Sequence, residues 1–392
     1  MVRTRWRAAV TGASVFMLAQ LVLAAPVGAH EDWHGQSGPA TITADMPSAV
    51  PAGRMWAFND FFPRTVSVPT GSDLTFINQG FHTFTVLPKG TSARSDQRTN
   101  GIAAADTDDA GLNPNGTTHA NLNQAALGPT STTCGTTADP CAFDGHSVVS
   151  SGTPAGPPAP FVVHVTAAPG TYVFVCRVHA GMNGQITVLP ANAHRPSQEH
   201  VQKQIARQVK QDLHGAWIAD WLASQAARTT NHDGTHTWHV TAGTSSADGH
   251  VALLEFLPKN IDVKAGDRVV FKPRSPNEPH TVTFPGDLGN EFQPMCEAGS
   301  VDVPLGPPTF SCSGGPPDEL ELDGGNGVSN VSTHTTIVDS GIIGPRRLAS
   351  AIALPKSAIL NRFTVSFDGA APGTYTYVCQ IHDGMAGTVT VH

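Results

Sequence analysis

The sequence has little charge, few tyrosines and almost no long apolar runs. Only 14% of its 392 residues are charged and three are Tyr, whereas Gly (39) and Pro (31) are abundant. This balance favours short strands joined by turns over long exposed helices. The formal net charge of −8 gives no electrostatic reason to bind nucleic acid. Beyond the N-terminal segment, no stretch approaches the length of a membrane span.

The N-terminal segment has the three parts of a secretory signal. Residues 1–29 contain three arginines, then a stretch of apolar and small residues at 8–25, and finally small residues at 27–29. Polar residues interrupt the apolar stretch, so we expect cleavage rather than permanent anchoring. The sequence therefore predicts a secreted or extracytoplasmic protein with no stable membrane span. Cleavage after Ala29 would place His30 at the new N-terminus, where it could chelate copper, although a frayed polar terminus is the simpler interpretation.

The second half of the chain repeats the first. The segment TYVFVCRVHAGMNGQITV (171–188) matches TYTYVCQIHDGMAGTVTV (374–391), and residues 62–86 match 257–284 in the same order. Within each copy, short stretches alternate apolar and polar residues and are separated by turn signals. This pattern predicts an all-β fold of two Greek-key β-sandwiches.

The repeat also predicts the domain organisation. We expect a signal peptide at 1–29, a first domain at 39–190, a helical linker at 191–234 and a second domain at 235–392. Within the linker, apolar residues recur mostly every four positions, as in an amphipathic helix that packs between or against the sandwiches. These residues are Val201, Ile205, Val209, Leu213, Trp217, Trp221 and Leu222.

Two insertions interrupt the repeats, at about 87–145 and 285–335. Their many Gly, Asn, Thr and Pro residues predict irregular loops. Each contains a pair of cysteines close in sequence, from which we expect two disulfides, Cys134–Cys141 and Cys296–Cys312. Cys176 and Cys379 then remain as one free thiol in each repeat. In an oxidising compartment such thiols need an explanation, and a metal supplies one.

The motif Cys-x-x-His-x-x-Met follows each free thiol. It comprises Cys176, His179 and Met182 in the first repeat and Cys379, His382 and Met385 in the second. A further histidine, His82 or His280, stands about a hundred residues upstream in each repeat. One thiolate, two imidazoles and one thioether form the ligand set of a type 1 blue-copper site. Zinc is the alternative, but it rarely takes Met and would require more Cys or His.

Both repeats resemble the plastocyanin/azurin family of cupredoxins, and their Cys-x-x-His-x-x-Met loops are most similar to that of amicyanin. The resemblance covers about 39–190 and 235–392 without the insertions. It implies two type 1 copper ions per chain, with His179 and His382 as the points at which electrons enter. The residue after the first His is commonly Asn in this family but is Thr83 or Thr281 here.

The resemblance favours an electron carrier over an enzyme. The chain has no His-x-His motif for a three-copper cluster, and Val175 and Val378 precede the blue-copper cysteines where nitrite reductases have His. The expected partner is a redox protein or a small-molecule electron donor or acceptor. A copper oxidoreductase with an unidentified catalytic copper and copper sequestration remain alternatives.

One histidine cluster keeps the enzyme alternative open. His232, His236 and His239 lie within eight residues and could form an extra copper site, although a polar, partly exposed strand is the simpler interpretation.

Overall fold

The computed structural model describes most of the chain after residue 39. The described residues are 40–102, 111–112, 118–119, 123–154, 159–225, 227–276, 278–286, 328–344 and 359–392. The expected signal peptide, His30 and the expected Cys296–Cys312 bridge lie outside them. Residues 38–392 form a single compact unit. In the part of the chain described, no helix has the length and apolar character needed to cross a membrane.

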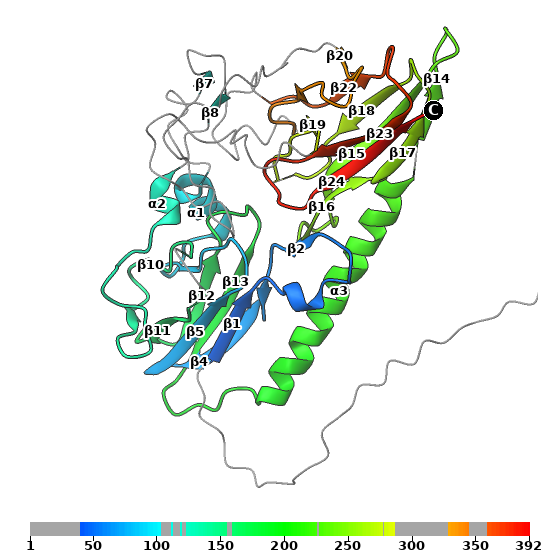
Figure 1. Ribbon diagram of the computed structural model, residues 1–392. Coiled ribbons are helices and arrows are strands. Elements are labelled where there is room, and N and C mark those ends of the chain that lie inside the picture. The colour runs from blue at the N-terminus through cyan, green and yellow to red at the C-terminus, as the bar shows by residue number, and fades with distance from the viewer. Residues whose placement is uncertain are drawn as a thin grey trace, which may run out of the picture. The chain divides into compact units, whose positions relative to one another are not determined.

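The first half of the chain builds a sandwich of two five-stranded sheets (Figure 1). One sheet has the order β3 (Phe61–Phe62), β1 (Ala40–Ala44), β5 (Ser72–Asn78), β11 (Phe161–Val165) and β9 (Cys141–Phe143). The other has the order β10 (Val149–Ser150), β6 (Thr85–Val86), β12 (Gly170–Val175), β13 (Asn183–Leu189) and β4 (Thr65–Pro69). Alternate residues of these strands point into one core, in which Phe61, Phe76, Phe84 and Phe174 are buried.

The second half builds a matching sandwich. One sheet has the order β2 (Trp56–Phe58), β16 (Val251–Leu257), β15 (His236–Ser245), β18 (Arg268–Lys272), β22 (Phe363–Ser366) and β20 (Val328–Asn330), and β14 (Ala227–Thr230) also pairs with β15. The other has the order β17 (Asn260–Val263), β24 (Ala386–Val391), β23 (Gly373–Val378), β19 (Thr283–Phe284) and β21 (Val338–Asp339). The predicted all-β fold of two sandwiches is confirmed. A small pair of strands, β7 (Gly111–Leu112) and β8 (Thr118–His119), stands apart from both.

One strand joins the halves by backbone hydrogen bonds. Strand β2 belongs in sequence to the expected first domain, yet it pairs antiparallel with β16, placing Trp56 opposite Leu253. Trp56 and Phe58 pack there against Leu257 and Ala216 in a third buried cluster. A short 3-10 helix, η1 (Pro47–Ala49), lies between β1 and β2.

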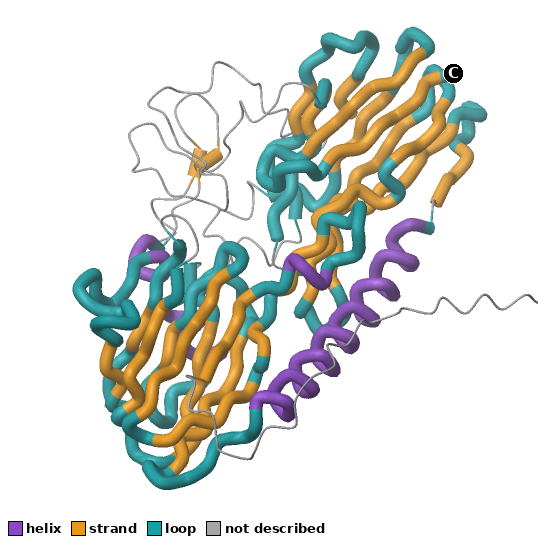
Figure 2. Tube along the Cα trace, turned by 60° about the horizontal axis from the view of Figure 1, so that its bottom comes forward, coloured by secondary structure: helices purple, strands orange, loops and turns teal. Residues whose placement is uncertain are grey.

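The predicted amphipathic helix is α3 (Gln198–Ser224), the long purple helix of Figure 2. Its N-terminus is capped by the Ser197 hydroxyl, which accepts a hydrogen bond from the backbone of His200. The expected burial of Trp217, Trp221 and Leu222 is wrong, because these side chains are 44%, 63% and 54% exposed.

Small residues explain the exposure of these large side chains. Ala216 and Ala223 are buried against β2 and β16. Alanine allows the helix to lie close to the sheet, and the large rings are left at the edge of this contact. Trp217 still packs edge-on against Trp56, with ring centroids 4.9 Å apart.

The first insertion is more regular than the sequence predicts. Besides β9, it contains α1 (Ala93–Asn100), capped by the Ser92 hydroxyl, and the short helix α2 (Gln124–Leu127). The expectation of an irregular loop across 87–145 is therefore wrong for these segments. A capping serine supports α1 locally, and contacts of α1 with the first sandwich, described below, hold it in place. The predicted Cys134–Cys141 disulfide is present.

Candidate metal centres

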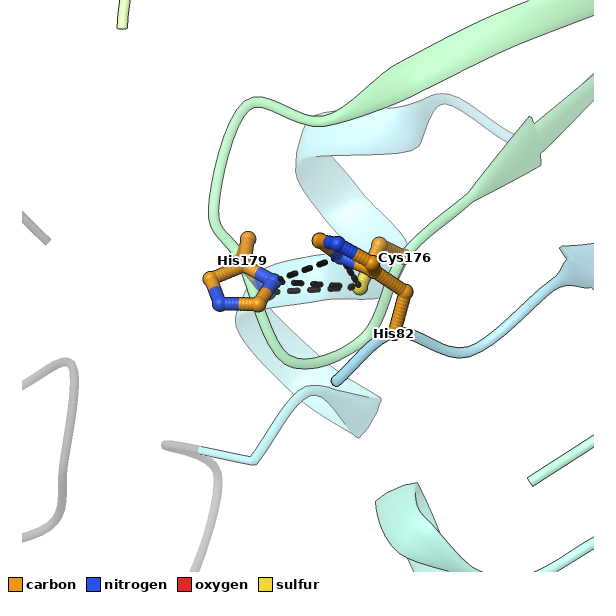
Figure 3. A group of neighbouring side chains, drawn as sticks. All are labelled: His82, Cys176 and His179. Carbon is orange, nitrogen blue, oxygen red and sulfur yellow. Dashed lines mark hydrogen bonds between the residues drawn. The ribbon is translucent and has the colours of Figure 1, made fainter. Parts of the chain in front are cut away.

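The first candidate centre lies where strands of the first sandwich end. Cys176 follows β12, and the loop that continues through His179 and Met182 leads into β13, whereas His82 lies between β5 and β6. The Cys176 sulfur is 3.7 Å from Nδ1 of His179 and 4.0 Å from Nδ1 of His82, and the two Nδ1 atoms are 3.0 Å apart. Figure 3 shows both rings turned toward the sulfur.

The second candidate centre repeats this arrangement. Cys379 follows β23, and its sulfur is 3.6 Å from Nδ1 of His382. The rings of His280 and His382 are 4.9 Å apart, compared with 4.7 Å for His82 and His179. In both centres the donor atoms of the three residues lie within 4.8 Å of one another.

The backbone closes both ligand loops in the same way. Cys176 donates its amide hydrogen to the carbonyl of Met182, and Met182 donates to the carbonyl of His179. The equivalent bonds join Cys379 to Met385 and Met385 to His382. Both methionines are buried, at 2% and 1% exposure. Each loop therefore holds a cysteine, a histidine and a methionine in one tight turn.

The spacing and charge of these donors fit one copper ion in each centre. Atoms 3.0 to 4.0 Å apart can all lie about 2 Å from a single ion, the usual length of a metal–ligand bond. Burial raises the pKa of both thiols, but the neighbouring histidines outweigh it and hold each pKa well below its usual value. A buried thiolate with two imidazoles, in a loop that also carries a buried methionine, is a donor set for copper rather than for Mg²⁺ or Ca²⁺.

The two histidines of the second centre differ in the charge that their surroundings favour. Burial lowers the pKa of His382, but the Cys379 thiolate and Glu278 outweigh it and raise the pKa to about 9. The charges around the His382 ring thus favour its positive form, whereas burial lowers the pKa of His280. Both ring nitrogens of His280 are buried without a hydrogen-bond partner among the described residues, as expected of a ligand that awaits a metal.

Solved structures of copper proteins resemble part of this chain. A plastocyanin from Dryopteris crassirhizoma is 17% identical, covering 39% of this chain and 99% of its own, with a TM-score of 0.19. An auracyanin from Roseiflexus castenholzii is 19% identical, covering 40% and 100%, with a TM-score of 0.22. An amicyanin variant is 15% identical, covering 42% and 92%, with a TM-score of 0.17. The chain resembles the cupredoxins.

No family model and no curated protein matches the chain. At such low identities the likeness concerns the fold alone. What each cupredoxin-like half can bind is therefore judged from its own residues.

Thr83 and Thr281, which follow the upstream histidine of each centre, join the two ligand segments. The Thr83 hydroxyl accepts a 2.8 Å hydrogen bond from the backbone of Arg177, and Thr281 accepts an equivalent bond from Gln380. The amides of Thr83 and Thr281 point at the sulfurs, at 3.5 and 3.3 Å. Hydrogen bonds to the charged form of a thiol stabilise the thiolate.

A glutamine that the sequence analysis did not single out braces the first centre. Gln97 of α1 donates through Nε2 to the carbonyls of Cys176, His179 and Met182, at 2.8 to 3.1 Å. Its Oε1 accepts from the amide of Gly181 at 3.1 Å. One side chain therefore contacts the whole ligand loop. No motif marks Gln97, because it lies in an insertion outside the repeat.

A left-handed residue near the end of one strand differs between the centres. Strands β1 and β15 run parallel to β5 and β18. Asp45 (φ 63°) directly follows β1, and Gly243 (φ 69°) lies near the end of β15. The Asp45 carboxylate faces the first centre, where the charge of His82 opposes the rise in pKa that burial causes. Gly243 lies directly against His280, and a Cβ there would be 1.9 Å from Nε2 of the ring.

The other histidines of the described residues do not form a comparable centre. Among the described residues, one more group has donor atoms within 4.8 Å: Asp60, Asp212 and His250. The Arg64 guanidinium contacts all three and already supplies the positive charge, so this group is an ion-pair network. The alternative copper site at His232, His236 and His239, which the sequence left open beside a polar strand, is not among the close groups of the described residues.

Proposed function

We propose that this chain is an exported copper-binding electron-transfer protein with one type 1 copper in each half. The first copper is held by His82, Cys176, His179 and Met182, and the second by His280, Cys379, His382 and Met385. The observation that carries the proposal is the pairing, found twice on equivalent strands, of a buried low-pKa thiol with a histidine Nδ1 at 3.6 to 3.7 Å.

Copper in such a ligand set takes up or releases one electron with little change in its ligands. The residues of the chain supply the rigidity that this requires. Backbone hydrogen bonds close each loop, and the hydroxyls of Thr83 and Thr281 tie each loop to the segment that carries the other histidine. Burial of the thiols at 0% and 4% exposure keeps water away from the sulfur. Because the pocket is preorganised, little free energy is needed to rearrange it when the charge of a bound metal changes.

Copper counting with single cysteine variants tests the proposal. The purified chain is expected to bind two copper ions and to show an intense visible band that reduction bleaches reversibly. Cys176→Ser and Cys379→Ser should each remove one centre and about half of the band. A matched control is the double variant Cys134→Ser/Cys141→Ser, which removes the described disulfide and should leave both centres intact. An unchanged band in either single variant would show that its site is misassigned, and extra copper without a visible band would favour the oxidoreductase alternative.

A further inference from the structure

Glu278 of the second half lies between the two candidate centres. Its Oε1 is 3.7 Å from Nε2 of His179, and its Oε2 is 3.8 Å from Nε2 of His382. All three side chains are only 13% exposed. One carboxylate therefore reaches a histidine of each centre from a site largely shielded from water.

The first half holds the carboxylate of Glu278, and the second half holds its backbone. Nδ2 of Asn59, in the first half, donates a 3.0 Å hydrogen bond to Oε1 of Glu278. The backbone amide of Glu278 donates to the hydroxyl of Ser275 at 3.1 Å. These contacts restrict the conformation of Glu278, whereas a surface glutamate samples many rotamers.

The two nitrogens of each histidine ring have separate tasks. Nδ1 of His179 and Nδ1 of His382 face the sulfurs, at 3.7 and 3.6 Å, whereas the Nε2 atoms face Glu278. Histidines that bind metals usually present the other ring nitrogen to a carboxylate or carbonyl, which orients the ring and raises its basicity. In this chain a single carboxylate faces both rings.

We propose that Glu278 is a shared positioning residue that couples the two centres. The coupling rests on the proposed function, because it concerns the histidines assigned to the two coppers. A single negative charge serves two rings, so a centre that becomes more positive draws the carboxylate toward its own histidine. The other histidine then loses part of its partner, and its centre becomes harder to oxidise.

The first test uses the metal-free protein and does not depend on copper. Histidine ring nitrogens are labelled with ¹⁵N and observed by NMR in the wild-type chain and in Glu278→Gln. The proposal predicts that the Nε2 signals of both His179 and His382 move in the variant, whereas those of His164 and His232 stay. A change at only one of the two rings, or at neither, would overturn the shared role.

A second measurement keeps Glu278 intact, in case the variant folds poorly. In Cys379→Ser, silver(I), a diamagnetic soft ion, is added to fill the first centre. Filling that centre should move the Nε2 signal of His382, which belongs to the other half. A His382 signal that stays constant while His179 responds contradicts the coupling.

The third test measures the potential of the second centre after copper loading. Removing the first centre with Cys176→Ser takes away the copper charge that draws Glu278 toward His179. The potential of the second centre should then fall by about 59 mV, which is tenfold in the equilibrium constant. With Glu278→Gln in both chains, this difference should shrink. Glu255→Gln is the matched control, since Glu255 is also 13% exposed and contacts the first half through Arg54, but touches neither centre. An equal difference with and without Glu278 would refute the coupling.

These arms separate the two proposals. If copper fails to bind but both Nε2 signals respond to Glu278→Gln, the proposed function is wrong and the shared carboxylate stands. If both coppers bind but the nitrogens do not respond, the shared carboxylate is wrong and the proposed function stands.

Discussion

In the first half, the ligand loop rests on α1, whose Gln97 contacts Cys176, His179 and Met182. Arg177, which directly follows Cys176 in that loop, donates two hydrogen bonds to Asp96 of the same helix, at 2.8 and 2.9 Å. In the second half, Gln380 takes the place of Arg177. Its side chain is buried and has no hydrogen-bond partner among the described residues.

A second difference lies beside His82 and His280, the upstream histidines of the two centres. The Asp45 carboxylate faces the first centre. At the second centre, Gly243 has no side chain, and the His280 ring lies where one would be. The same ligand pattern is thus held by different surroundings. Outer residues of this kind set the potential and affinity of a metal site, so we expect two centres with equal ligands and unequal properties.

The largest expected effect comes from closing the space beside His280. In Gly243→Ala the new Cβ would lie 1.9 Å from the Nε2 of His280, and the left-handed backbone adds strain. The ring must move away, so the second centre should be lost while the first remains. Copper counting should fall from two ions to one.

Asp45→Ala is the matched control, because this position already carries a Cβ beside the first centre. It should leave two coppers bound. Two coppers in Gly243→Ala would show that the second centre tolerates a large shift of His280.

A smaller effect is expected from Asp339, a buried acid at a position where the first half has Ser150. Ser150 and Asp339 occupy equivalent places: Ser150 pairs with the Thr85 hydroxyl, and Asp339 accepts from the Thr283 hydroxyl. Burial raises the pKa of Asp339 to about 6, with the Cys379 charge adding to the rise. The folded state then binds this proton more tightly than the unfolded state, so stability falls as the pH rises from about 4 to above 6.

Asp339→Asn should remove this dependence. The amide oxygen can still accept the bond from the amide of Gly341, and the amide NH₂ can donate to the Thr283 hydroxyl, but the side chain does not titrate. We expect the variant to lose about 2–3 kcal/mol of the difference in unfolding free energy between pH 4 and pH 7. Urea unfolding at the two pH values measures it. Part of the slope should remain, since burial also raises the pKa of Asp60 to about 6. A slope identical to that of the wild type would show that Asp339 titrates normally.

The comparison also shows what the sequence could and could not predict. The ligand loops are short segments in which Cys, His and Met stand three residues apart, and their local hydrogen bonds repeat in both halves. Because the sequence is duplicated, the ligand loops can be recognised without knowledge of the fold. The strands follow from alternation, because one side of each faces a core.

No pattern in the sequence marks the contacts between the halves. Glu278 and Asn59 lie 219 residues apart and have no counterpart in the repeat, and β2 joins the sheet of the other half. The apolar period of α3 predicts a helix, yet Ala216 rather than Trp217 turns toward the sheet. Such choices depend on how large surfaces pack, which a pattern along one chain does not specify.

The smallest expected effect concerns the brace of the first centre. In Gln97→Ala the ligand loop loses hydrogen bonds to three carbonyls and one amide, of which the three from Nε2 share a single NH₂ group. We count these contacts as about two full hydrogen bonds of about 1 kcal/mol each. The first centre should therefore lose about 2 kcal/mol of copper-binding free energy, which is about thirtyfold in affinity. The second centre should be unchanged, because nothing described contacts its loop in this way. Competition with a copper chelator in the Cys379→Ser and Cys176→Ser backgrounds measures each centre alone. Equal weakening of both centres would mean that α1 stabilises the whole chain rather than the loop it contacts.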